Sequence, residues 1–273
     1  MPTEPSRPLP RRRAPRCGTL RAALTASAAL AVAAPLLAGC GDDAAGSEGK
    51  GGATLRVLAA SSLTDVFKAA GKAYEKEHPG TTVKFSFAGS QELAAQVREG
   101  VPADVLVTAD TKTMKGLSGE TAAEPSVIAK NRLTIATAPG NPHHVRSLKD
   151  LSKKDLKVVL AASEVPVGRY GQQILDEQHV KVDPVSREVN VRSVLTKVEM
   201  GEADAGLVYV TDATVAGDKV GTVRIPDARN AVASYPAAPL KSSKHAKDAA
   251  AFSKWLGSPE AQKLLREAGF GKP

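Results

Sequence analysis

Small hydroxyl and glycine residues stand at three points where an apolar run gives way to a helical pattern. They are Ser61-Ser62 before Leu63, Gly89-Ser90 before Gln91, and Pro166-Val167-Gly168 before Arg169. The first N–H groups of a helix lack partners inside the helix and together carry about half a positive charge, so they can bind an anion without Lys or Arg. Serine is also among the commonest helix caps. The spacing alone therefore leaves two interpretations open, an anion site and simple capping.

Other residues with chemical potential fit catalysis or metal binding less well. His143 and His144 are adjacent in the polar sequence NPHHVR, which is typical of solvated loop side chains. Asp104 and Asp110 lie near a strand, but no His or Lys accompanies them at a spacing suited to acid–base catalysis, and we expect capping or turn roles. Ser62 lacks the G-x-S-x-G elbow of a nucleophilic serine. We therefore predict a protein that is not an enzyme.

The elements that must position the three junctions alternate between strand and helix. Apolar runs predict strands at 54–60, 82–87, 103–110, 133–138, 157–162, 205–210 and 231–240, and helical patterns follow at 63–78, from 90 onward, at 246–256 and at 259–268. Continuous apolar strands that alternate with helices are typical of an α/β architecture whose sheets are covered on both faces. In such folds ligands bind outside the carboxyl ends of the strands, where these junctions lie.

The N-terminal segment has the order of a bacterial export signal. Five arginines between positions 11 and 21 precede an apolar stretch at 22–38, which is short for a membrane-spanning helix. The sequence LAGC that ends at Cys40 resembles the lipobox of bacterial lipoproteins. We expect residues 1–39 to be a lipoprotein signal peptide, Cys40 to be lipidated, and the Gly- and Ser-rich residues 40–52 to form a flexible tether. A transmembrane anchor is the alternative. Lipidation would place the protein at the cell membrane, on its extracytoplasmic face.

Removal of the signal peptide changes the composition. Residues 1–39 carry six of the 37 Lys and Arg residues and one of the 29 Asp and Glu residues, so the remainder has a net charge of +3. A surplus this small forms no basic stripe of the kind that nucleic-acid binding requires, and we predict no nucleic-acid partner. Cys17 leaves with the signal peptide and Cys40 would be acylated, which leaves no free thiol for a disulfide or metal site.

Several phrases occur together in one order along the chain. They are AASSLTDVF (59–67), FAGSQELAAQVREGVPADVLVTAD (87–110), SEVPVGRYGQQIL (163–175), NVRSVLTKVEMGEADAGLVYVTDA (190–213) and SYPAAPL (234–240). Together they resemble the periplasmic molybdate-binding proteins of ABC transporters, over about residues 54–270. The resemblance implies a type II periplasmic-binding-protein fold, with two α/β lobes joined by two crossing segments and a ligand cleft between them. It places lobe 1 at 53–133 plus 232–273 and lobe 2 at 134–231.

The resemblance also implies an oxyanion site made of neutral donors. By position it assigns hydroxyl ligands to Ser62 and Ser90, backbone N–H ligands to Val167 and Val191, and a phenol donor to Tyr209. Gly89 stands where relatives often carry Ser, and Val167 often appears as Ala, but neither change removes a donor. No cofactor and no direct metal ligand is expected, because the metal arrives inside the oxyanion.

We therefore expect a monomeric lipoprotein that captures molybdate, and tungstate, and delivers it to an ABC permease in the membrane. A cage of donors suits a fully deprotonated dianion and rejects hydrogen phosphate, whose O–H needs an acceptor. Three alternatives stay open at this point. One is a binder of sulfate or another tetrahedral oxyanion, one is an anchored serine hydrolase that uses Ser62, and one is an adhesive lipoprotein without a small ligand.

Overall fold

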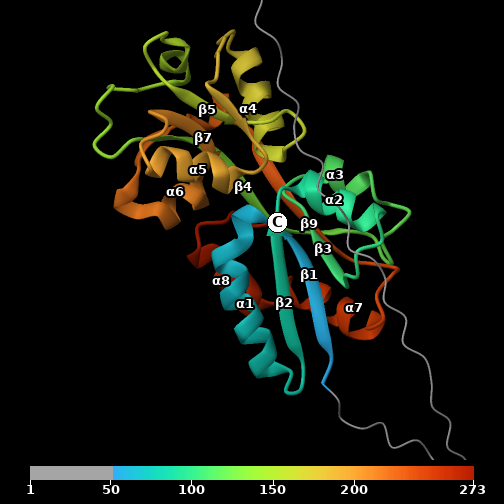
Figure 1. Cartoon of the computed structure of the whole chain (residues 1–273). Coiled ribbons are helices and arrows are strands. Elements are labelled where there is room, and N and C mark those ends of the chain that lie inside the picture. Colours follow the sequence, from blue (N-terminus) through green and yellow to red (C-terminus); the bar gives the residue numbers. More distant parts are fainter. Residues whose placement is uncertain (1–51) are drawn as a thin grey trace, which may run out of the picture. The chain divides into compact units, whose positions relative to one another are not determined.

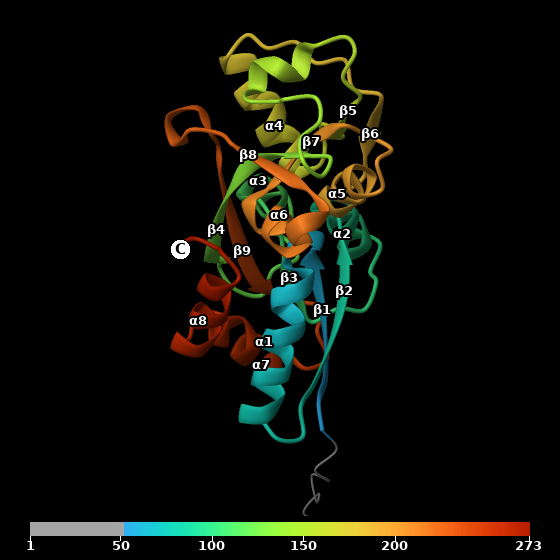
Figure 2. The same ribbon diagram turned by 90° about the vertical axis from the view of Figure 1, so that its left-hand side faces the viewer.

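The computed structural model describes residues 52–273 (Figures 1 and 2). The predicted signal peptide, the lipidation site at Cys40 and the tether up to residue 51 lie outside the described residues. No helix within 52–273 is long and apolar enough to cross a membrane.

One curled, mixed sheet of nine strands organises the described chain. Its strand order is β2-β1-β3-β9-β4-β7-β5-β6, and β8 pairs with β4 off this path. The strands are β1 (Thr54–Ala60), β2 (Thr82–Ala88), β3 (Val105–Val107), β4 (Ser126–Thr137), β5 (Val158–Ala161), β6 (Ser186–Glu188), β7 (Ala205–Tyr209), β8 (Gly221–Arg224) and β9 (Val232–Pro239). Every strand expected from the apolar runs is present, and β6 and β8 are additional. The α/β class is confirmed.

Strands β4 and β9 make the centre of the sheet antiparallel, whereas β1 pairs in parallel with β2 and β3, and β5 pairs in parallel with β6 and β7. The pairing of β4 changes along its length. Residues Ser126–Arg132 pair with β9, and residues Leu133–Thr137 pair with β7 and β8. The strand expected at 133–138 therefore begins earlier, at Ser126, because residues 126–132 also become a strand by pairing with β9. One strand thus connects the two halves of the sheet.

Eight α-helices flank the sheet in the described chain, and four 3₁₀ turns lie in its connections. The helices are α1 (Thr64–Glu77), α2 (Ser90–Arg98), α3 (Thr111–Lys115), α4 (Pro166–Glu177), α5 (Val191–Glu199), α6 (Val210–Ala216), α7 (Ala246–Trp255) and α8 (Pro259–Glu267). The turns are η1 (Ser61–Leu63), η2 (Leu148–Ser152), η3 (Gly217–Lys219) and η4 (Asp227–Arg229). Helix α4 begins at Pro166 rather than after Gly168, since proline at the first helical position loses no hydrogen bond and has a suitable φ.

The helices gather on two sides of the central strands. In both views α4 and α5 lie beside β5 and β7 in the upper part, whereas α1, α7 and α8 lie in the lower part (Figures 1 and 2). Val66, Phe67, Ala70 and Tyr74 repeat at helical spacing and are all buried, so they form the inward face of α1. On α2, Leu93 and Ala94 are buried and Val97 is half-buried.

Aromatic rings fill the space between α1 and α7. Phe252 and Trp255 both lie edge-on to the Tyr74 ring, with ring centroids 4.9 and 5.2 Å away. This packing fixes α1 against the sheet, and so it fixes the junction between β1 and α1 where Ser61 and Ser62 lie. The fold thereby gives the first serine junction a rigid support.

Candidate functional site

All five residues assigned by the resemblance line one small pocket. Its lining consists of Ala60, Ser61, Ser62, Ala88, Gly89, Ser90, Ala109, Val165, Pro166, Val167, Asn190, Val191 and Tyr209. These residues come from the ends of β1, β2, β3 and β7 and from the starts of α2, α4 and α5. The cavity volume is about 10 Å³, room for about one water molecule. That volume is far below the ~300–1,000 Å³ typical of sites for drug-sized molecules, so the pocket suits only a very small ligand.

Ser90 begins α2 and is almost fully buried. Its Oγ accepts a hydrogen bond of 2.9 Å from the backbone N–H of Ala109. A hydroxyl has a single proton, and this contact occupies one of its acceptor lone pairs. The Ser90 proton therefore remains free for a partner in the pocket.

Ser62 lies in the short turn η1 and is 3 % exposed. Its Oγ is 2.9 Å from the hydroxyl oxygen of Tyr235 on β9, and either atom can be the donor. No His, Asp or Glu is among the residues that line the pocket. The base that a nucleophilic serine needs is thus absent from the lining, which disfavours the hydrolase alternative.

Val167 and Val191 occupy the first turns of α4 and α5, where backbone N–H groups have no acceptor within the helix. The cap of α5 is Asn190, whose side-chain oxygen accepts from the backbone N–H of Ser193 at 3.0 Å. This cap leaves the Val191 N–H for another acceptor. Both valine side chains are buried in the core, so only their backbones have polar groups to offer the pocket.

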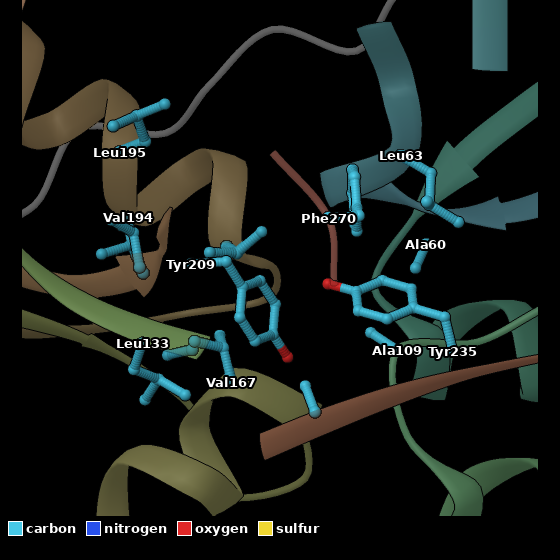
Figure 3. Packing of buried hydrophobic residues seen from close by; sticks show 14 of the residues in the cluster. Ala60, Leu63, Ala109, Leu133, Val167, Val194, Leu195, Tyr209, Tyr235 and Phe270 are labelled. Carbon is cyan, nitrogen blue, oxygen red and sulfur yellow. The ribbon is translucent and has the colours of Figure 1, made fainter. Parts of the chain in front are cut away.

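Tyr209 ends β7, and its hydroxyl is one of two buried side-chain polar atoms in the described residues without a hydrogen-bond partner, the other being Oε1 of Gln91. Figure 3 shows Tyr209 and Tyr235 as neighbours, with the hydroxyl of Tyr235 on the side of Tyr209, and the two rings lie edge to face with centroids 6.0 Å apart. Burial raises the pKa of Tyr209 well above its usual value, which keeps the phenol protonated. An unpartnered buried hydroxyl costs about 1–3 kcal/mol, and a ligand acceptor would recover that cost.

The pocket contains no charged side chain, although two arginines lie close to it. Arg169 on α4 bonds the carboxylate of Asp110 and, at 2.9 Å, Oγ1 of Thr113. Arg192 on α5 bonds Asp212 at 2.6 Å and Asp65 on α1 at 2.7 Å. Both cations are therefore neutralised by carboxylates. The groups that line the pocket are neutral donors, whose dipoles point at the space a ligand would occupy.

The remaining chemical candidates have structural roles or lie elsewhere. Asp110 caps α3 by accepting from the Thr113 N–H at 2.9 Å, as expected of a capping residue. Asp104 accepts from the Arg56 N–H at 2.6 Å and from the Ser243 hydroxyl at 2.6 Å, which joins the start of β3 to β1 and to the segment after β9. His143 lies 3.3 Å from Asp204, outside the pocket lining. Within residues 52–273 no group of three or more His, Cys, Asp and Glu side chains could hold a metal ion.

Sequence reasoning missed the contacts made by residues just outside the pocket lining. Asn131 and Tyr235 support Ser62, and the pairs Asp110–Arg169 and Asp65–Arg192 join opposite sides of the pocket. These partners are 59 to 173 residues apart in the chain. A pattern of local spacing contains no signal for such contacts.

A curled α/β sheet with a small, neutral, donor-lined pocket at converging strand ends defines the class of two-lobed solute-binding proteins. Solved structures share this fold, and two of them show the similarity to this chain. One is the periplasmic molybdate-binding protein of Azotobacter vinelandii, with a TM-score of 0.71, 21% identity and coverage of 80% of this chain and 99% of that one. The other is the sulfate-binding protein SubI of Mycobacterium tuberculosis, with a TM-score of 0.72, 19% identity and coverage of 80% and 86%.

The chain belongs to the bacterial extracellular solute-binding protein family, whose model matches residues 55–271. The molybdate-binding protein ModA of Mycobacterium tuberculosis is 38% identical over 251 residues, which cover 89% of this chain and 96% of the relative. ModA of Haemophilus influenzae is 36% identical over 247 residues, with coverage of 86% and 94%. The relatives are binding proteins, and this chain is a solute-binding protein rather than an enzyme.

Proposed function

We propose that the protein captures molybdate, and tungstate, outside the cytoplasmic membrane and delivers the oxyanion to an ABC permease. The observation that carries this proposal is the unpartnered Tyr209 hydroxyl, buried in a small pocket that otherwise offers neutral donors. Hydrogen bonds to charged groups contribute roughly 1.5–3 kcal/mol each, so a few donors suffice for micromolar binding, about −8 kcal/mol, without a buried cation.

The donors of the proposed site are the hydroxyls of Ser62, Ser90 and Tyr209 and the backbone N–H groups of Val167 and Val191. The helix starts at α2, α4 and α5 add positive dipole ends on several sides of the same space. Such a site holds a tetrahedral dianion that accepts at every oxygen. Relatives named for molybdate, at 36–38% identity over most of the chain, favour molybdate over other anions of this shape.

The two lobes of the proposal are residues 53–133 with 232–273, and residues 134–231. The change of pairing partner on β4 between Arg132 and Leu133 supports the first crossing, and the segment between β8 and β9 supplies the second. Ser62 and Ser90 then lie on one lobe, and Val167, Val191 and Tyr209 lie on the other. An anion that bridges both sets would favour the closed state.

The proposal includes the membrane anchor and the oligomeric state. The lipobox pattern at Cys40 supports attachment through lipid, in accord with the extracellular location of the family. The protein would act as a monomer, since delivery to a permease requires one ligand-loaded molecule at a time. Labelling of cells with a radioactive fatty acid tests the anchor, and a C40A protein that still carries label would refute it.

Thermal unfolding of residues 41–273 with molybdate, tungstate, sulfate and phosphate in turn tests the ligand. An anion at about 1,000 times its dissociation constant stabilises a protein by roughly 4 kcal/mol, which gives a large shift of the melting temperature. We expect such a shift with molybdate and tungstate. A shift with sulfate instead would keep the site and change the substrate, as the fold of SubI allows. No shift with any of the four anions would refute the proposal.

A further inference from the structure

A tyrosine that does not line the pocket stands directly behind one of its serines. Tyr235 on β9 is fully buried, and its hydroxyl oxygen lies 2.9 Å from Oγ of Ser62, although 173 residues separate the two in the chain. If the pocket is the proposed oxyanion site, this contact determines the direction in which the Ser62 proton points.

Asn131 on β4 is the first member of a hydrogen-bonded chain that runs through Tyr235 to Ser62. Its Oδ1 accepts from the Arg132 N–H at 2.9 Å, which identifies the opposite side-chain atom as the Nδ2 donor. Nδ2 donates to Oγ1 of Thr211 at 2.8 Å and to the hydroxyl oxygen of Tyr235 at 3.4 Å. An amide nitrogen has two protons and accepts none, so the direction of both bonds is determined.

Tyr235 is the second member of this chain, and its hydroxyl has a single proton to donate. The Tyr235 oxygen accepts a hydrogen bond from Asn131, and of the two partners of this hydroxyl only Oγ of Ser62 can accept its single proton. Burial raises the pKa of Tyr235 above its usual value, so the phenol keeps that proton at neutral pH. Oγ of Ser62 becomes the acceptor, and the serine proton is left to point into the pocket.

We propose that Tyr235 is a positioning residue that holds the Ser62 hydroxyl as a donor toward the bound anion. The Ser90 hydroxyl is oriented by the backbone instead, because its oxygen already accepts from the Ala109 N–H. Both serines therefore direct their protons toward the ligand. A serine free to rotate could instead accept the O–H of hydrogen phosphate, so the chain from Asn131 through Tyr235 also contributes to the rejection of protonated oxyanions.

Tyr235→Phe removes the hydroxyl and keeps the ring, and titration calorimetry with molybdate and with phosphate measures the effect. We expect the affinity for molybdate to fall about tenfold, the size of one hydrogen bond. We expect the affinity for phosphate to fall less or to rise, so that the ratio of the two dissociation constants narrows. Tyr74→Phe, which alters another buried phenol on α1, is the matched control and should leave both affinities unchanged.

Double variants distinguish positioning from a general structural effect. In an S62A background Tyr235→Phe should cause no further loss, since the hydroxyl it orients is gone. In an S90A background it should cause the full loss of about tenfold, because Ser90 is oriented separately. Equal losses in both backgrounds, or no loss in the wild-type background, would overturn the inference.

A second variant covers the case in which Tyr235→Phe does not fold. Asn131→Leu keeps the side-chain volume and removes the Nδ2 donor without adding a charge, so the Tyr235 oxygen becomes free to accept from Ser62. We expect N131L to lose molybdate affinity, by no more than S62A does. An N131L protein that binds like the wild type overturns the inference, whereas a wild-type protein that binds no oxyanion refutes the proposed function itself.

Discussion

A methyl group at position 89 would collide with the backbone on the other side of the pocket. Gly89 caps α2 with φ −62° and ψ 141°, a conformation that alanine adopts without strain. A Cβ built there lies 2.5 Å from the carbonyl oxygen of Val189 and 2.5 Å from Nε2 of Gln91. Gln91 has a flexible side chain and can move, but the Val189 carbonyl is backbone and accepts from Gln91 at 2.7 Å. Gly89→Ala therefore tests whether this close approach is needed for binding.

The size of the effect follows from the missing space. Ordinary contacts of a Cβ begin near 3.4 Å, so the two sides of the pocket must separate by about 0.9 Å along this direction. Overpacking of this kind costs about 1–3 kcal/mol, which corresponds to about a 5- to 150-fold loss of affinity. The collision would destabilise only the closed state, because position 89 and Val189 would be farther apart in an open cleft. The melting temperature of the ligand-free protein should therefore change little.

Calorimetric titration with molybdate measures the affinity, and thermal unfolding without ligand measures the stability. Gly119→Ala is the matched control, because a Cβ at position 119 meets no atom within 4 Å. We expect G119A to bind like the wild type. A G89A protein with unchanged affinity would show that the site does not require the observed approach of Gly89 to Val189, and it would refute the reasoning.

Three further predictions concern single side chains. Tyr209→Phe should lower the affinity for molybdate by about 10- to 100-fold and leave the melting temperature of the ligand-free protein equal or higher, because the lost hydroxyl has no partner there; a marked loss of stability would contradict this. Arg169→Gln should weaken molybdate binding several-fold, because it removes the bond to Asp110 across the pocket. Calorimetric titration measures the affinity, and an unchanged value would show that this pair does not assist closure. Burial raises the pKa of Asp212 from 3.8 to about 6, although Arg192 opposes the shift. The folded state therefore holds this proton more tightly than the unfolded state, and the contribution of Asp212 to the free energy of unfolding falls as the pH rises from about 4 to 6. Thermal unfolding from pH 4 to 7 should show that Asp212→Asn removes this fall, and an identical pH profile for both proteins would contradict the assignment.

Local pattern was sufficient for most elements. Helix α1 could be predicted because Val66, Phe67, Ala70 and Tyr74 repeat at helical spacing, and all four face the core. Short apolar runs likewise marked β1, β5 and β7, whose residues are nearly all buried. The serine and glycine junctions lie where strands end and helices begin, so the neighbourhood of the pocket was also accessible from sequence.

The short elements escaped prediction for a physical reason. Strand β6 (Ser186–Glu188) and strand β8 (Gly221–Arg224) alternate between half-buried and exposed residues and carry few apolar side chains. They are strands because β5 and β4 offer them partners, and not because of their own composition. The antiparallel centre of the sheet was missed in the same way, since pairing direction depends on which distant strand lies alongside.

The sequence by itself determined the α/β class, the order of its main elements and the small residues at their junctions, because these depend on side chains within one or two turns of each other. Only the tertiary structure decided which groups meet. The contact of Ser62 with Tyr235 and the bond of Arg192 to Asp65 join residues 173 and 127 positions apart. Contacts of this length arise when the sheet curls and brings strand ends together, and a periodic pattern along the chain records the face that a residue turns inward but not the partner it finds there.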